Sequence, residues 1–231
     1  MSKSLVLVGE GHGEASALSE LARKILRDKK NETLYVDKQV IRAHNALGLV
    51  TWDKQKNTTD CSKWIKTIGI ARTRRDLGAV LAIFDGDAKS FPAGSQKPFC
   101  PATAAKEMAL AAADAGAGKI FSLAVVFACV EYETWLIAGV ESLAGQKLED
   151  GRLALPARAT FSTGDPESHG KGWLEKNCQG YRPTRDQKTL TGLLDLNVVR
   201  AKKLRSFTRL EHAIDQLLVA VQSGTHISTP A

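Results

Sequence analysis

The sequence predicts an α/β protein in which helices cover both faces of a mostly parallel sheet, with further helices added at the C-terminus. Three observations lead to this prediction. Apolar segments of strand length alternate along the chain with segments whose apolar residues recur at helical spacing. The strand-like segments are apolar throughout, as expected where both faces of a sheet are buried. Towards the C-terminus the strand-like segments stop and only helical ones follow.

The first part of the chain supplies the predicted strands and the helices between them. The expected strands are residues 4–8, 34–41, 78–85 and 121–129. The expected helices are residues 14–27, 61–72, 101–116 and 131–139. Strands and helices therefore alternate, which favours a parallel or mostly parallel sheet. Ligand sites in such sheets lie at the carboxyl ends of the strands.

The second part begins with residues 145–183, which are rich in Gly, Pro, Ser and charge and predict a long irregular connection. Helices are expected at 186–196, 197–204 and 206–224, and a frayed tail after them. We therefore divide the chain into a core, residues 1–144, and residues 145–231, whose irregular connection and C-terminal helices pack on that core.

Composition and charge narrow the class of protein. Apolar residues make up 43% of the chain and charged residues 25%, as in globular proteins. Because no apolar run approaches the ~20 residues that span a bilayer, and the N-terminus lacks a signal peptide, we expect a cytoplasmic protein without membrane contact. The four cysteines are far apart, which argues against a zinc site. The net charge of +7 favours polyanionic partners, nucleic acid first among them.

Acidic residues follow three of the predicted strands. They are Glu10 and Glu14 after the first strand, Asp85 and Asp87 after the third, and Glu131 and Glu133 after the fourth. Because parallel strands end at one edge of a sheet, we expect these carboxylates to lie close together. Such a cluster is costly unless a cation neutralises it, and carboxylate oxygens suit Mg²⁺, Mn²⁺ or Ca²⁺. The pattern predicts a metal site at this edge.

The glycine-rich loop GEGHGE, residues 9–14, is part of this prediction. It lacks the lysine of a Walker A loop and does not fit GxGxxG. Its two glutamates would repel a phosphate, so we expect the loop to bind a metal ion that in turn binds the phosphate. Structural roles also remain open for these acids. Glu14 suits a helix N-terminus, Asp85 and Asp87 suit a turn, Glu131 suits the first turn of a helix, and Glu133 suits a solvated position.

Taken together, these residues resemble the Toprim domain of topoisomerases, bacterial-type primases and OLD-family nucleases. The resemblance rests on three features: a strand followed by Glu and Gly, an acidic residue that opens a helix, and a later strand that ends in DxD. The order of motifs is closer still to domain-of-unknown-function family 4276. Its matching segments here are GEGHGE, DGD at 85–87, EYETWLIA at 131–138, a lysine-containing helix around 186–189 and SFTRL at 206–210. Gly9 and Gly13 replace the valine and threonine of the family's VEGxTE, and neither change removes a metal ligand.

The resemblance implies a Toprim-like, Rossmann-like fold and Mg²⁺- or Mn²⁺-dependent hydrolysis of phosphodiester bonds in DNA or RNA. It implies catalytic roles for Glu10, Asp85, Asp87 and Lys188, and metal ligation by Glu10, Glu14, Asp85, Asp87, Glu131 and Glu133. Glu10 would serve as metal ligand or general acid/base, and Lys188 would stabilise charge on the phosphate. The resemblance also implies an ATPase partner encoded nearby, in anti-phage defence.

Two clusters of basic residues are candidates for nucleic-acid contact. They are Arg72, Arg74 and Arg75, and Lys202, Lys203 and Arg205. Solvated helix faces are the simpler explanation of such clusters. Two other functions stay open: a non-catalytic module that binds nucleic acid or an ATPase partner, and a small-molecule phosphohydrolase or nucleotidyl transferase that uses the same metal site.

Overall fold

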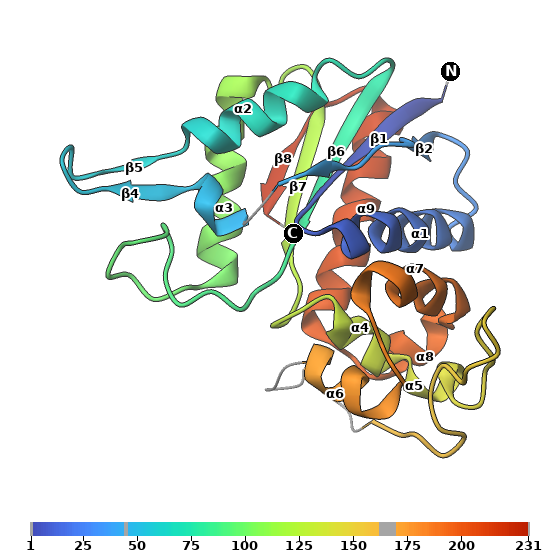
Figure 1. Ribbon diagram of the computed structural model, residues 1–231. Coiled ribbons are helices and arrows are strands. Elements are labelled where there is room, and N and C mark those ends of the chain that lie inside the picture. The colour runs from blue at the N-terminus through green and yellow to red at the C-terminus, as the bar shows by residue number, and fades with distance from the viewer. Residues whose placement is uncertain (1, 44–45, 162–169, 231) are drawn as a thin grey trace.

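A six-stranded parallel sheet forms the centre of the computed structural model, which describes residues 2–43, 46–161 and 170–230, with the backbone alone at 12–14, 46–47 and 230 (Figure 1). The strand order is β2-β1-β6-β7-β8, and β3 also pairs with β1. All of these pairings are parallel, which confirms the predicted fold class and is consistent with a Rossmann-like arrangement. The strands are β1 (Lys3–Gly9), β2 (Leu34–Val36), β3 (Ile41–Arg42), β6 (Leu77–Phe84), β7 (Ser122–Phe127) and β8 (Ser228–Pro230).

Helices cover both faces of the sheet. One face packs against α1 (His12–Asp28) and α9 (Arg205–Ser223), and the other against α2 (Ser62–Ala71) and α3 (Pro101–Ala111) (Figure 1). Successive strand residues alternate between the two cores. In β1, for example, Leu7 faces the core under α1 and Val8 faces the core under α2. Both kinds of position are buried and apolar, which explains why the strands are apolar throughout.

The remaining elements add a small hairpin and a group of short helices. They are η1 (Ala46–Leu49), β4 (Thr51–Asp53), β5 (Thr58–Asp60), η2 (Ala112–Ala115), α4 (Glu133–Ala138), α5 (Val140–Leu143), α6 (Gly170–Asn177), α7 (Pro183–Leu193) and α8 (Leu196–Ala201). In Figure 1 the helices α4 to α8 lie together below the sheet, and they contribute to the same hydrophobic core as α1 and α9. Helix α7 packs directly against α1.

Four sequence expectations about secondary structure are wrong. The expected strand 34–41 is divided into β2 and β3, because the carboxylate of Asp37 accepts a hydrogen bond from the Gln39 backbone at 2.8 Å and turns the chain. The polar stretch after it contains the antiparallel β4–β5 hairpin. Helix α6 lies within the segment expected to be irregular. The expected frayed tail forms β8, which pairs with the otherwise open edge of β7.

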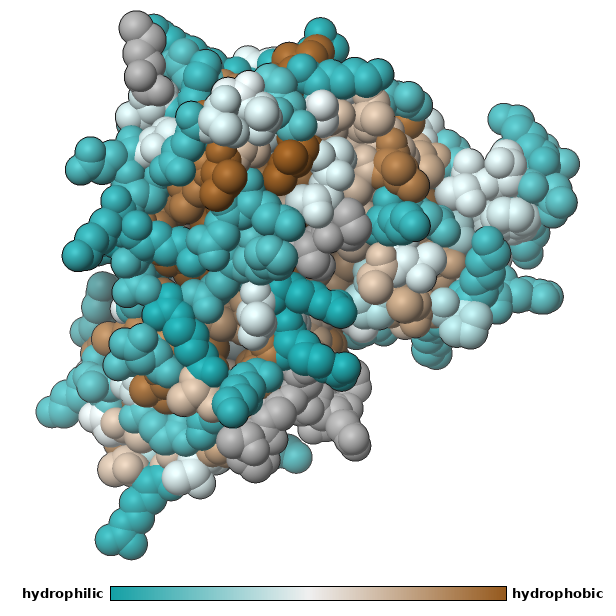
Figure 2. Space-filling view, turned by 180° about the vertical axis from the view of Figure 1, so that it is seen from behind, coloured by the Kyte–Doolittle hydropathy of each residue, from teal (hydrophilic) through white to brown (hydrophobic). Residues whose placement is uncertain are grey.

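The rear face of the molecule is mainly hydrophilic (Figure 2). Figure 2 shows hydrophilic residues over most of the rear face, with apolar residues in small separate patches. Among the helices that the structure describes, none combines the length and the apolar character needed to cross a membrane.

Candidate functional site

The strand ends that carry acidic residues meet at one edge of the sheet. Val8 of β1 is paired in register with Ala82 of β6, and Phe84 of β6 with Phe127 of β7. The residues that follow these three neighbouring strands therefore emerge side by side at the carboxyl edge. This register, rather than any local signal, places Glu10 beside Asp85.

Glu10 and Asp85 are joined by a hydrogen bond across the strand ends. The backbone N–H of Asp85 donates to Oε1 of Glu10 at 3.3 Å. Oδ1 of Asp85 in turn accepts a hydrogen bond of 2.8 Å from the backbone N–H of Tyr132. Both carboxylates are half-buried. The two predicted catalytic acids are thus oriented by backbone groups from the next strand along the sheet.

The backbone around Asp85 is tightly packed against the turn after β7. Gly86 donates a backbone hydrogen bond to the carbonyl of Val130 at 2.9 Å. A Cβ atom at Gly86 would lie 2.4 Å from the carbonyl oxygen of Ala128, so only glycine fits between the two acids of the DGD motif. Val130 has a φ of 61°, which is rare for a β-branched residue. Strained backbone of this kind is concentrated at functional sites.

Asp87 and Glu131 complete the acidic residues near this edge. Asp87 is exposed and follows Gly86 directly. Glu131 is half-buried, and its Oε2 accepts a hydrogen bond of 2.9 Å from the backbone N–H of Lys171 in the first turn of α6. A carboxylate at the N-terminus of a helix is favoured by the helix dipole. Glu131 therefore has a structural partner of its own.

Glu133 lies in the interior, two residues further along. Its side chain is only 3% exposed, and its Oε1 accepts hydrogen bonds from the hydroxyl of Tyr181 and from Nε2 of Gln187, both at 3.0 Å. Burial raises the pKa of Glu133. Burial and the neighbouring Glu133 carboxylate also raise the pKa of Tyr181, which keeps its hydroxyl a neutral donor. Sequence spacing alone does not reveal this depth.

The described acidic side chains do not form a preformed metal-binding site. In the described part of the chain, no group of three Asp, Glu, His or Cys residues could hold a metal ion. The side chain of Glu14, which the sequence also predicts as a ligand, lies outside the described residues. The donor set of Glu10, Asp85 and Asp87 nevertheless consists only of carboxylate oxygens from neighbouring strand ends, which is the chemistry that Mg²⁺ and Mn²⁺ require.

Lys188 lies on the exposed side of α7. It lines a cavity of about 610 Å³ beside α1 and the β2–β3 connection. Arg74 lines the same cavity, so two basic residues that the sequence proposes separately come together here. Three further basic residues belong to the lining, Arg23, Lys38 and Arg42. Sequence reasoning missed them because each stands outside the basic clusters.

The other predicted basic residues are not gathered in that cavity. Arg72, Arg75, Lys203 and Arg205 are exposed. Lys202 is held by neighbours, because its Nζ donates to the carbonyl of Phe161 at 2.8 Å and pairs with the carboxylate of Glu141. It has a structural role in joining α8 to the preceding segment.

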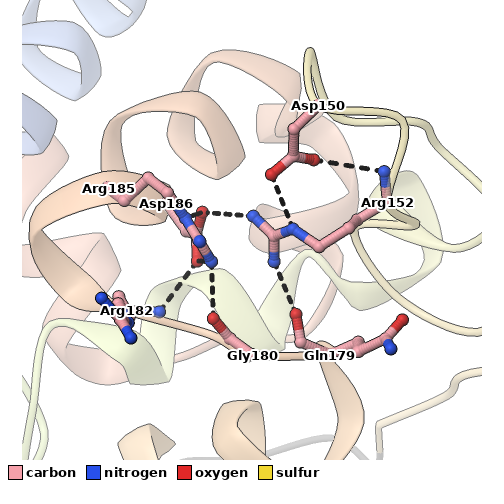
Figure 3. A network of polar contacts seen from close by, with 7 residues as sticks. All are labelled: Asp150, Arg152, Gln179, Gly180, Arg182, Arg185 and Asp186. Atoms are coloured by element: carbon pink, nitrogen blue, oxygen red, sulfur yellow. Dashed lines mark hydrogen bonds and ion pairs between the residues drawn. The ribbon is translucent and has the colours of Figure 1, made fainter.

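Three successive residues of the 186–189 motif contact different parts of the molecule. Asp186 is 3% exposed and accepts hydrogen bonds from Arg152 at 2.8 Å, from Arg185 at 2.7 Å and from the Arg182 backbone at 2.8 Å (Figure 3). Burial by itself would raise the pKa of Asp186, but these hydrogen bonds outweigh it and lower the pKa to about 2. Gln187 reaches Glu133, and Lys188 reaches the cavity. Sequence reasoning singled out Lys188 and missed the structural role of its neighbours.

Searches of the curated proteins and of the solved structures give no match to this chain. One family model does match, over residues 9–215, and its description is Domain of unknown function (DUF4276). The match begins at the end of β1 and runs into α9, so it includes the acidic strand ends, the 186–189 motif and the cavity. The chain belongs to the DUF4276 family.

Proposed function

We propose that this protein hydrolyses phosphodiester bonds in DNA or RNA with a divalent metal ion, Mg²⁺ or Mn²⁺. The observation that carries the proposal is the pairing of Glu10 with Asp85 at the carboxyl edge of adjacent parallel strands. Acidic residues that emerge side by side at one sheet edge are costly to ionise together, and a bound divalent cation would offset that cost. The resemblance to Toprim nucleases also supports metal-dependent hydrolysis of phosphodiester bonds.

The residues that would hold the ion are Glu10, Asp85 and Asp87, with Glu14 opening the neighbouring helix. When bound, a divalent ion would polarise a phosphoryl oxygen of the substrate and activate a water molecule. The chain itself orients the acids, since backbone N–H groups of Asp85 and Tyr132 fix Glu10 and Asp85 respectively. Such preorganisation lowers the cost of reaching the reactive arrangement. An ATPase partner and a role in anti-phage defence extend the proposal on the resemblance alone.

A cleavage assay with geometry-preserving variants tests this proposal. Purified protein is incubated with end-labelled DNA and RNA, with Mg²⁺, Mn²⁺ or EDTA, alone and with the product of any adjacent ATPase gene. Asp85→Asn and Glu10→Gln keep the acceptor oxygens of the observed hydrogen bonds but remove the charge, so each is expected to reduce cleavage at least ~100-fold while the thermal unfolding midpoint stays close to wild type. Asp114→Asn removes an equal charge from η2, before β7 begins, and should cleave normally.

The proposal fails if neither nucleic acid is cut under any of these conditions. It also fails if Asp85→Asn cuts as fast as wild type. Turnover of free nucleotides without cleavage of polymers would instead identify a small-molecule phosphohydrolase.

A non-catalytic module that binds nucleic acid is the second candidate. It is favoured by the basic lining of the cavity beside α1. Binding without cleavage, unchanged in Asp85→Asn, would establish it.

A further inference from the structure

The cavity beside α1 gathers positive charge from four separate parts of the chain. Arg23 comes from α1, Lys38 and Arg42 from the segment that includes β3, Arg74 from the turn after α2, and Lys188 from α7. We name this the basic cavity. Its volume of about 610 Å³ falls within the ~300–1,000 Å³ usual for ligand sites, and none of the described residues that line it is acidic.

These cations differ from the arginines that the structure holds in ion-pair networks. Arg152 is paired with Asp150 and Asp186, and Arg200 with Asp28 and Glu211. Within the described ranges, by contrast, Arg23, Lys38, Arg42 and Lys188 make no ion pair. The basic cavity therefore concentrates uncompensated positive charge, which attracts anions.

Arg74 gives a second and independent sign of a missing ligand. Its Nη1 donates to Oε1 of Gln39 at 2.8 Å, which holds the guanidinium at the cavity wall. Its Nε is buried and has no hydrogen-bond partner in the described part of the chain. A buried donor without an acceptor costs free energy, and an anion in the cavity would satisfy it.

The lining indicates which anion. Arginine guanidinium groups match the geometry of phosphate oxygens, and lysines add point charges. Several cations over one cavity suit a run of phosphates better than a single carboxylate. None of the described lining residues is aromatic, so the cavity offers no platform on which a base could stack. Recognition would then depend on phosphates and not on base identity.

The basic cavity adjoins the acidic strand ends. Arg42 is paired in register with Gly9, and the backbone N–H of Ala43 donates to the Gly9 carbonyl at 2.8 Å. Gly9 immediately precedes Glu10, and α1 begins two residues after Glu10. A phosphate chain seated in the cavity would thus lead directly to Glu10.

We infer that the basic cavity binds the sugar–phosphate backbone of a nucleic acid strand next to Glu10, without regard to base sequence. The identity of the polymer rests on the proposed function. Binding itself needs neither the metal nor cleavage, so the two can be tested separately.

The test measures binding of labelled single-stranded oligonucleotides by fluorescence anisotropy in EDTA. Wild type is compared with Lys38→Gln, Arg42→Gln and the double variant, because both side chains are exposed and their loss leaves the core intact. Each substitution is expected to weaken binding roughly 3- to 10-fold and to reduce the slope of log K against log salt by about 1. Lys119→Gln, an exposed lysine in the turn before β7, is the matched control and should bind like wild type.

Oligo-dT, oligo-dA and mixed sequences should bind with similar affinity, and ATP or pyrophosphate should compete only weakly. The inference is overturned if wild type does not bind oligonucleotides, if the cavity variants bind like the control, or if ATP binds in the cavity more tightly than the oligonucleotide. If the wild-type protein cuts nothing but the cavity variants lose binding, this inference stands and the proposed nuclease activity is rejected. If the wild-type protein cleaves nucleic acid but the cavity variants bind normally, the nuclease proposal stands and this inference is rejected.

Discussion

The indole nitrogen of Trp135 donates a hydrogen bond of 3.0 Å to the hydroxyl of Ser206. Both side chains are buried, and the two residues belong to two motifs that lie far apart in the sequence, EYETWLIA and SFTRL. The ring of Phe207 lies 6.1 Å from that of Trp135, in an edge-to-face arrangement. The two motifs are therefore parts of one packing unit, which ties α4, just after the candidate site, to α9.

Ser206→Ala should destabilise the protein without affecting ligand binding. The substitution leaves the buried indole N–H of Trp135 without an acceptor, so the free energy of unfolding should fall by about 1–3 kcal/mol. Urea unfolding measures this change. Ser223→Ala, in the exposed last turn of α9, should change stability by no more than about 0.5 kcal/mol. Equal effects of the two substitutions would contradict a role for the Trp135–Ser206 bond.

Gly86→Ala should disturb the candidate site through packing alone. The new Cβ would lie 2.4 Å from the Ala128 carbonyl, so the turn after β7 must shift, and the Tyr132–Asp85 hydrogen bond shifts with it. We expect a loss of about 1–3 kcal/mol in the free energy of unfolding. Gly69→Ala is the control, because nothing lies within 4 Å of its Cβ and alanine favours the helix. That control should gain roughly 0.5–1 kcal/mol. Unchanged stability of Gly86→Ala would disprove the close approach.

Asp186→Asn should weaken the fold in a pH-dependent way. The folded pKa of about 2 lies below the ordinary value of 3.8, so this carboxylate stabilises the fold above about pH 4, and that stability is lost as the pH falls towards 2. The variant should therefore lose about 2 kcal/mol at pH 7, and its deficit should shrink in acid. Asp150→Asn, whose side chain is 45% exposed, should lose less stability than Asp186→Asn, because solvent screens its charge. A deficit that does not change between pH 7 and acid would rule out this explanation.

Glu133→Gln separates a structural role from metal ligation. The folded pKa of Glu133 is raised, so its contribution to stability is present below the ordinary pKa and is lost as the pH rises through the folded pKa. The variant does not titrate, and its stability relative to wild type should therefore increase from acid to neutral pH. Chemical unfolding across that range measures the difference. If Glu133 is a metal ligand, the variant will also lose Mg²⁺-dependent cleavage. A stability difference that is independent of pH would contradict the raised pKa.

Local pattern predicted the fold class and the main strands of this protein. Burial on both faces makes β1, β6 and β7 apolar throughout, and helical spacing marks α1 and α9, so these elements can be recognised without their neighbours. The acidic residues after the strands can also be recognised from the sequence, because they directly follow recognisable strands and a parallel sheet brings its strand ends to one edge. Short elements were missed because their signals are weak. β8, for example, exists only because the edge of β7 accepts it.

The sequence by itself determined the main strands β1, β6 and β7 and the acidic groups that stand at their carboxyl ends. Only the tertiary structure decided how those groups differ. It joins Asp85 to Glu10 by a hydrogen bond, and it buries Glu133 in contact with the Tyr181 hydroxyl. It also brings the basic residues of the cavity together from four distant segments. The physical reason is that periodicity reports the environment of one element at a time. Depth, hydrogen-bond partners and the meeting of remote charges depend on how the elements pack together.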